Sequence, residues 1–140
     1  MAGSTGVSRT QWASVVLSTI AVAWMFAPTF PMVWMPSPGA TLITWHSWAD
    51  PLTLGHAVFS PLVLLAAIIA AVVGWFGVFR RRATLAPVAC CAVAVGLAVL
   101  LFVMVGVHVM SIVPILLLVL SGALQWRAVS QSRRTDPARG

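Results

Sequence analysis

The arginines constrain this fold more than any other feature, because they occur in clusters separated by long apolar stretches. All eight positively charged residues are arginines: Arg9, Arg80, Arg81, Arg82, Arg127, Arg133, Arg134 and Arg139. An apolar stretch of about 20 residues can cross a bilayer, and arginine is strongly biased toward the cytoplasmic side. The pattern predicts a multi-pass protein of the cell (plasma) membrane whose arginine clusters and two termini are cytoplasmic.

The composition agrees with a membrane protein and excludes a water-soluble domain. Hydrophobic residues make up 61% of the chain and charged residues 7%, with a mean hydropathy of +1.03. Soluble domains are about 45 to 50% apolar and about 25% charged. The net charge of +6 is explained by the bias of arginine toward the cytoplasm, so we expect no nucleic-acid partner. Attraction to anionic lipids predicts that Arg80, Arg81 and Arg82 anchor the chain at the cytoplasmic leaflet.

The apolar stretches predict an all-α integral membrane protein, a four-helix transmembrane bundle within residues 1–127. The expected spans cover about 12–27, 57–79, 84–107 and 112–126. An alternative for the first span is a cleaved signal peptide, because Ala21-Val22-Ala23 has the small residues of a cleavage site. Residues 128–140 are polar and lack apolar periodicity, so we expect a frayed helix end and then a cytoplasmic, disordered tail.

Residues 28–55 form the predicted outer loop, which is rich in proline and tryptophan and contains no basic residue. Two β-prone runs, 32–35 and 42–45, flank Pro36-Ser37-Pro38-Gly39. This arrangement predicts a short β-hairpin lying on the membrane. Trp34, Trp45 and Trp48 are expected to contact the membrane interface or a partner protein.

Small residues recur at steps of four in two of the predicted spans. They are Ala66, Ala70 and Gly74 in the second span, and Ala92 and Gly96 in the third. Small residues at this spacing let transmembrane helices approach closely. We expect the second and third spans to pack on each other along these stripes.

The residues needed for catalysis or ion coupling are scarce. The chain contains no glutamate, and its two acids are Asp50 and Asp136, outside the predicted spans. Ion-coupled transporters usually carry ionisable residues within the bilayer. Ser47, His46 and Asp50 contain the three groups of a hydrolytic triad, but sequence proximity alone does not establish its geometry. An enzyme is therefore not the favoured interpretation.

Histidines and methionines gather in the predicted outer half of the molecule. Candidate ligands are His46, His56, His108, Met104 and Met110. Imidazole and thioether groups bind copper and can serve as axial ligands of haem iron. The alternative is that histidine tolerates the membrane interface and methionine fills irregular gaps there. A copper or haem site on the outer side is therefore a second hypothesis, and no cofactor is favoured.

The segment Trp45-His46-Ser47-Trp48 leads into a Leu- and Ala-rich helix that contains Pro61 and ends at Gly74-Trp75 and the arginines. In this layout the chain resembles small four-helix membrane proteins that are common in high-GC Gram-positive bacteria. The resemblance implies the four-span arrangement over about two thirds of the chain. It implies no ligand, activity or functional residue.

The favoured function is non-catalytic. Ample packing surface and interface tryptophans predict an accessory or stabilising subunit of a larger membrane complex, or a homo-oligomer. The copper or haem protein is the alternative. A small channel or lipid-handling protein is a third possibility, because apolar pathways leave little trace in a sequence.

Overall fold

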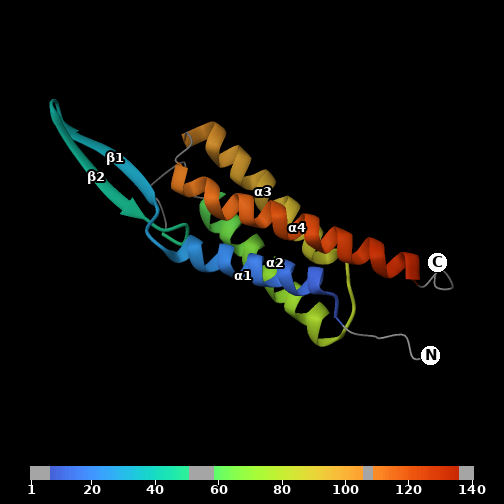
Figure 1. Ribbon diagram of the computed structural model, residues 1–140. Coiled ribbons are helices and arrows are strands. Elements are labelled where there is room, and N and C mark those ends of the chain that lie inside the picture. The colour runs from blue at the N-terminus through green and yellow to red at the C-terminus, as the bar shows by residue number, and fades with distance from the viewer. Residues whose placement is uncertain (1–6, 51–58, 106–108, 136–140) are drawn as a thin grey trace.

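The computed structural model describes residues 7–50, 59–105 and 109–135. In this part of the chain the backbone forms four α-helices and one two-stranded antiparallel sheet (Figure 1). The elements are α1 (Arg9–Phe26), β1 (Phe30–Ser37), β2 (Ala40–His46), α2 (Phe59–Phe79), α3 (Ala86–Val105) and α4 (Val109–Thr135). The mostly helical fold and the small hairpin that the sequence predicts are both present.

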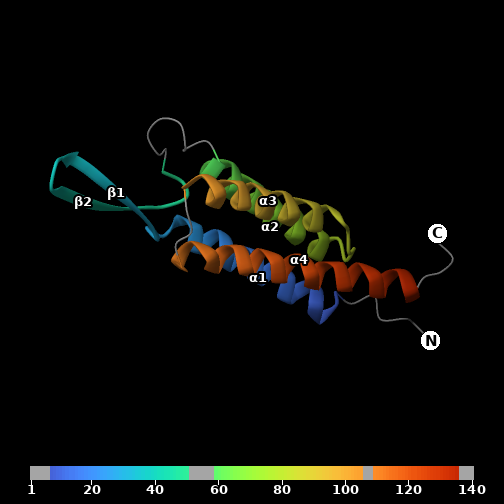
Figure 2. The same ribbon diagram turned by 90° about the horizontal axis from the view of Figure 1, so that it is seen from above.

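The helices form two layers in which consecutive helices run in opposite directions (Figure 2). One layer contains α2 and α3 and the other α1 and α4, while α1 also contacts α2 and α3 contacts α4. The hairpin projects from the end where α1 ends and α2 begins, called here the hairpin end. At the opposite end, called the arginine end, α1 begins at Arg9 and α2 ends just before Arg80.

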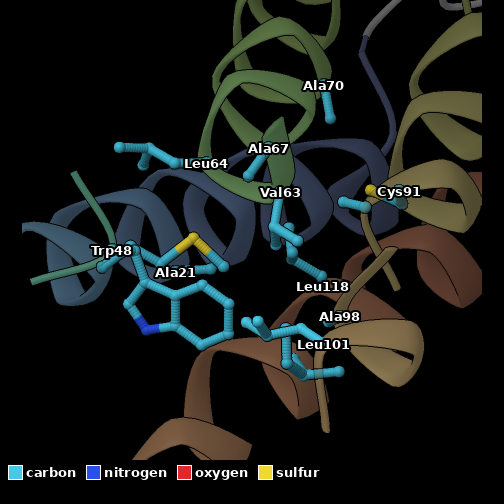
Figure 3. Close-up of a cluster of buried hydrophobic side chains, with 13 residues drawn as sticks. Ala21, Trp48, Val63, Leu64, Ala67, Ala70, Cys91, Ala98, Leu101 and Leu118 are labelled. Carbon is cyan, nitrogen blue, oxygen red and sulfur yellow. The ribbon is translucent and has the colours of Figure 1, made fainter. Parts of the chain in front are cut away.

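Each helix contributes one seam, a row of inward-facing residues, to the interior of the bundle. Most of these residues are small or polar, and the larger apolar ones are Met25, Val63, Leu101 and Leu118. Buried positions recur at alternating steps of three and four residues, the repeat of helices that pack at about 20° in left-handed bundles. The seams are Gln11, Ser14, Ser18, Ala21 and Met25 on α1; Ser60, Val63, Ala67, Ala70, Gly74 and Gly77 on α2; Pro87, Cys91, Ala94, Ala98 and Leu101 on α3; and Ser111, Pro114, Leu118, Ser121, Gln125 and Ala128 on α4. Figure 3 shows the apolar part of this interior, with side chains from all four helices.

Large apolar side chains cover the outside of the bundle. They include Trp12, Val16, Ile20, Leu65, Ile69, Val72, Val93, Val99, Leu100, Leu116, Val119 and Leu120. Water-soluble bundles bury such residues and expose polar ones, so this pattern is reversed. Three of the described helices, α2, α3 and α4, are long and apolar enough to cross a membrane. Helix α1 is not among these three, so the fourth span stays a prediction.

Helix α4 continues well past the predicted end of the fourth span. It runs to Thr135, so the helix is longer than the frayed end that the sequence predicts, while residues 136–140 lie outside the described residues and the disordered tail stays a prediction. Ala128 and Val129 are buried, which gives this polar segment an inward apolar face. Arg133 and Arg134 lie in the last turn, where positive charge interacts favourably with the helix dipole.

The hairpin extends away from the helices rather than folding back over their ends (Figures 1 and 2). Its register pairs Phe30 with His46 and Trp34 with Leu42, and then shifts before Ser37 pairs with Ala40. Gly39 closes the turn with φ of +84°, a conformation that glycine adopts at little cost. The hairpin therefore does not cover the helix ends, and the prediction that it lies on the membrane stays a prediction.

Candidate functional site

The small residues of α2 pack inside the bundle, and at Gly74 the neighbour is α1. Ala70 and Gly74 are buried and Ala66 is half-buried. A Cβ atom on Gly74 would lie 3.0 Å from Cγ2 of Val15, so the missing side chain permits the close approach of α1. The sequence predicts that this stripe packs against α3. At Gly74 it packs against α1 instead.

The small residues of α3 face outward. Ala92 and Gly96 are exposed, and a Cβ atom on Gly96 would have no other atom within 4 Å. Helix α3 packs instead through Cys91, Ala94 and Ala98. The expectation that both stripes pack against each other is thus wrong for α3, and a pair of small residues four apart remains on the outer surface of the bundle.

The hairpin carries a second exposed apolar surface. On one face lie Val33, Met35, Ile43 and Trp45, all exposed, with Met35 at 80%. Trp34 and Leu42 are exposed on the other face. Because no residue between Arg9 and Asp50 is charged, the hairpin presents an uncharged, aromatic surface.

A chain of polar contacts crosses the base of the hairpin. Nε1 of Trp34 donates to Oγ1 of Thr44 at 2.8 Å, and this hydroxyl lies 2.8 Å from Nε2 of His46. Nδ1 of His46 lies 3.5 Å from Oδ2 of Asp50. The same carboxylate oxygen accepts a hydrogen bond from the Ser47 amide at 2.7 Å. These contacts fix the imidazole between the strand and the turn that follows it.

The arrangement differs from the Ser47, His46 and Asp50 triad that the sequence allows. Oγ of Ser47 accepts a hydrogen bond from the amide of Ala49, whereas the hydroxyl beside the imidazole belongs to Thr44. The hydroxyl of Thr44 already accepts the indole N–H of Trp34. Ser47 is therefore not placed as the nucleophile of such a triad.

The copper or haem hypothesis falls largely on residues outside the described part of the structure. His56, His108 and the side chain of Met104 lie there. Among the described residues no group of three or more His, Cys, Asp or Glu side chains is placed to hold a metal ion. His46 is half-buried in the hairpin network, and Met110 is exposed in the first turn of α4. The hypothesis stays a prediction.

Trp48 lies in the core, contrary to the prediction that it contacts a partner. Its side chain is 1% exposed and lies beside Ala21, Val63 and Leu101 (Figure 3). Its amide donates to the carbonyl of Met25 at 3.0 Å. The segment that follows the hairpin is therefore anchored in the bundle by an indole ring. Of the three predicted contact tryptophans, Trp34 and Trp45 remain on the surface.

Two serines join α1 to α4, an interaction that our sequence analysis missed. Oγ of Ser14 donates to the carbonyl of Ser121 at 2.9 Å, and Oγ of Ser121 donates to the carbonyl of Ser14 at 2.9 Å. The signal is present in the chain, because Gln11, Ser14 and Ser18 recur on one side of an otherwise apolar helix. Between apolar helices, hydrogen bonds of this kind contribute about 0.6 kcal/mol on average and up to about 2 kcal/mol.

Two buried glutamines hold the connection between α2 and α3, and our sequence analysis missed them too. Nε2 of Gln11 donates to the carbonyl of Arg82 at 3.1 Å. Nε2 of Gln125 donates to the carbonyl of Thr84 at 3.2 Å. The α1 and α4 layer thereby donates hydrogen bonds to two backbone carbonyls of the exposed connection between α2 and α3 at the arginine end.

The turn that ends α2 has a defined geometry. The amide of Arg82 donates to the carbonyl of Gly77 and the amide of Arg81 to that of Val78, which is the Schellman motif. Arg81 takes the left-handed position of this motif with φ of 52°. A Cβ atom on Gly77 would lie 2.9 Å from the carbonyl oxygen of Arg82, so glycine is required for this turn.

The described residues therefore offer two exposed small or apolar surfaces and a fixed arginine turn, and no assembled catalytic or metal centre. Comparison of the chain with models of known protein families, with curated proteins and with solved structures finds no match in any of the three.

Proposed function

We propose that this chain is a four-span integral membrane protein with its arginine end in the cytoplasm, acting as a non-catalytic subunit. It assembles with copies of itself or with a larger membrane complex through the outer face of α3, and its hairpin reaches a partner on the opposite side of the membrane. The observation that carries the proposal is the outward position of Ala92 and Gly96.

Membrane placement is supported by the reversed distribution of side chains. Helices α2, α3 and α4 have the length and composition of spans. The outer face of α1 is formed by Trp12, Val16, Ile20 and Trp24, although its inner face is polar. In water, exposure of so many apolar side chains would be unfavourable, whereas hydrocarbon solvates them and favours polar groups paired in the interior.

Assembly through α3 is supported by the unused small residues. Inside the bundle, Gly74 and Gly77 each permit a close contact, so the fold places glycines where neighbouring chain segments touch. A Cβ atom on Gly96 would lie in open space, so this glycine permits no close contact between segments within one copy. In membranes, small residues four apart allow backbones to approach and gain van der Waals contact. A helix of a second subunit fits this surface.

The hairpin supports a contact outside the membrane. Strand β1 spans eight residues, and a strand rises about 3.3 Å per residue, so its tip reaches roughly 25 Å beyond α1. The exposed side chains along the hairpin include Trp34 near its middle and Trp45 near its base, both of the aromatic type enriched at protein interfaces. An uncharged surface along a hairpin that projects from the helix ends suits a protein partner.

The test replaces Gly96 with leucine and follows assembly. Gly96→Leu is expected to dissociate the oligomer or complex in mild detergent, because the larger side chain separates the helices. Ala123→Leu is the matched control, since Ala123 is also small and exposed but lies on α4. Native mass spectrometry and crosslinking in native membranes give the readout. A wild-type chain that is monomeric and crosslinks to no protein would overturn the proposal.

A further inference from the structure

Three aromatic rings form a cluster on the outer surface of α1 and α2 at the arginine end. The rings of Trp12 and Trp75 meet edge to face with centroids 5.6 Å apart, and Trp75 stacks on Phe79 at 5.7 Å. Nε1 of Trp75 donates to Oγ1 of Thr19 at 3.2 Å, which fixes its orientation. Phe79 is 74% exposed and Trp12 is also exposed. Aromatic rings of this kind prefer the boundary between lipid headgroups and acyl chains.

Arginines border this cluster. Arg80, Arg81 and Arg82 follow Phe79 directly, and Arg9 lies three residues before Trp12, which places it on the same side of α1. All four are exposed. Within the described residues none of them has an ion pair, because the one described acid, Asp50, lies at the hairpin end and contacts His46.

The arginine turn is held in place before any ligand binds. Its Schellman hydrogen bonds, the contact of Gln11 with the Arg82 carbonyl and the absence of a side chain at Gly77 fix the backbone. Gln125 holds the next residues through the Thr84 carbonyl. A binding site that is ordered in advance loses less conformational entropy when it binds.

We infer that the aromatic cluster and the arginine turn form a site for one anionic phospholipid, whose acyl chains lie on Trp12, Trp75 and Phe79. The phosphate is bound by guanidinium groups of the turn, which pair with phosphate oxygens through charge-assisted hydrogen bonds. Basic sites between transmembrane helices on the cytoplasmic side bind lipid headgroups in this way. The inference rests on the membrane placement proposed above, but it is independent of assembly through α3.

The arginines at the end of α4 provide the contrast that makes the inference specific. Arg133 and Arg134 are exposed and adjacent, like Arg81 and Arg82, but they lie beyond the last buried residue of their helix. If lipid binding came only from the general attraction of positive charge to an anionic surface, both pairs of arginines would contribute to it. Binding to a specific lipid site at the turn would depend on Arg81 and Arg82 alone.

The experiment uses the full chain in mild detergent and measures the retention of phosphatidylglycerol by native mass spectrometry. Phosphatidylcholine with the same acyl chains is the reference lipid. The paired variant Arg81→Gln with Arg82→Gln is compared with Arg133→Gln with Arg134→Gln, because each pair removes two charges. We expect the turn variant to bind phosphatidylglycerol about 25-fold more weakly, at about fivefold for each arginine, and the α4 variant to match the wild type.

A second measurement uses protein in which all the arginines are intact, so its result does not depend on whether the turn variant folds. Phosphatidylglycerol with brominated acyl chains is expected to quench tryptophan fluorescence more than brominated phosphatidylcholine, and Trp12→Phe with Trp75→Phe should remove the difference. Equal loss of lipid from both arginine variants, equal retention of the two lipids, or displacement by inorganic phosphate would each overturn the inference. Loss of assembly in Gly96→Leu with lipid binding unchanged leaves it standing.

Discussion

At the residue scale, the backbone conformation at position 81 favours glycine, yet the residue there is an arginine. With φ of 52° it occupies the left-handed region, which costs a non-glycine residue about 1 kcal/mol. Glycine is the usual residue at this position of a Schellman motif. In the proposed membrane placement, a guanidinium group here, immediately after an apolar helix, opposes movement of the segment into hydrocarbon. The position of the charge therefore outweighs the local backbone preference.

Replacement of Arg81 by glycine should stabilise the fold. We expect Arg81→Gly to raise the free energy of unfolding by about 1 kcal/mol, because the left-handed conformation becomes unstrained. Arg80→Gly is the control and should lower it by about 0.5 to 1 kcal/mol, since the amide of Arg80 still makes a helical hydrogen bond to Phe76. Reversible unfolding in mixed detergent micelles measures both variants. A less stable Arg81→Gly protein would contradict the strain assigned to this residue.

At the element scale, the positions of the helices and hairpin can be predicted, but the inward faces of the helices cannot. Apolar stretches bounded by prolines or arginines predict spans, and Pro38-Gly39 between β-prone runs predicts a hairpin, which forms. On α3, however, nearly every side chain is apolar, so hydropathy does not separate the face of Ala92 from that of Cys91. Only the structure shows which small residues of α3 face inward and which face outward.

Trp48 was mispredicted for a related reason. Tryptophan suits both a membrane interface and a protein core, and the spacing from Trp45 does not distinguish them. Here the turn at Ser47 and Asp50 reverses the chain after β2 and directs the Trp48 indole into the bundle. This outcome depends on contacts between residues of the loop and the end of α1, which a single sequence does not reveal.

The pairing of α1 with α4 gives a prediction at this scale. Ser14→Ala should lower the free energy of unfolding by about 0.6 kcal/mol, and by no more than about 2 kcal/mol, because it removes a hydrogen bond between helices. Ser18→Ala is the control, since Oγ of Ser18 donates to the carbonyl of Val15 in its own helix. We expect little change there, measured by the same unfolding assay. Equal effects of the two substitutions would show that the serine pair does not join the helices.

At the scale of the whole molecule, charge is segregated between the two ends of the bundle. The described arginines lie toward the arginine end, and the described acid, Asp50, lies at the hairpin end. Moving guanidinium groups across hydrocarbon costs several kcal/mol for each group, so this distribution favours one orientation in the membrane. The candidate lipid site and the hairpin would then face opposite compartments.

Single cysteines test this orientation in cells. On a background with Cys90 and Cys91 changed to alanine, Ser37→Cys at the hairpin tip should react with an impermeant maleimide added to intact cells. Ser130→Cys in α4 should react only after the membrane is permeabilised. The opposite labelling pattern would place the arginine end outside and would reverse the proposed topology.

The serine pair has a consequence for how the protein is made. Ser14 and Ser121 are separated by 107 positions, so α1 leaves the ribosome long before its partner exists. At about 5 to 20 residues per second, this delay lasts roughly 5 to 20 seconds. In the proposed membrane placement, the polar side of α1 has no α4 to cover it during that interval, and lipid is a poor solvent for it. A translocation machine or chaperone that shelters one helix until the last is translated would meet this need.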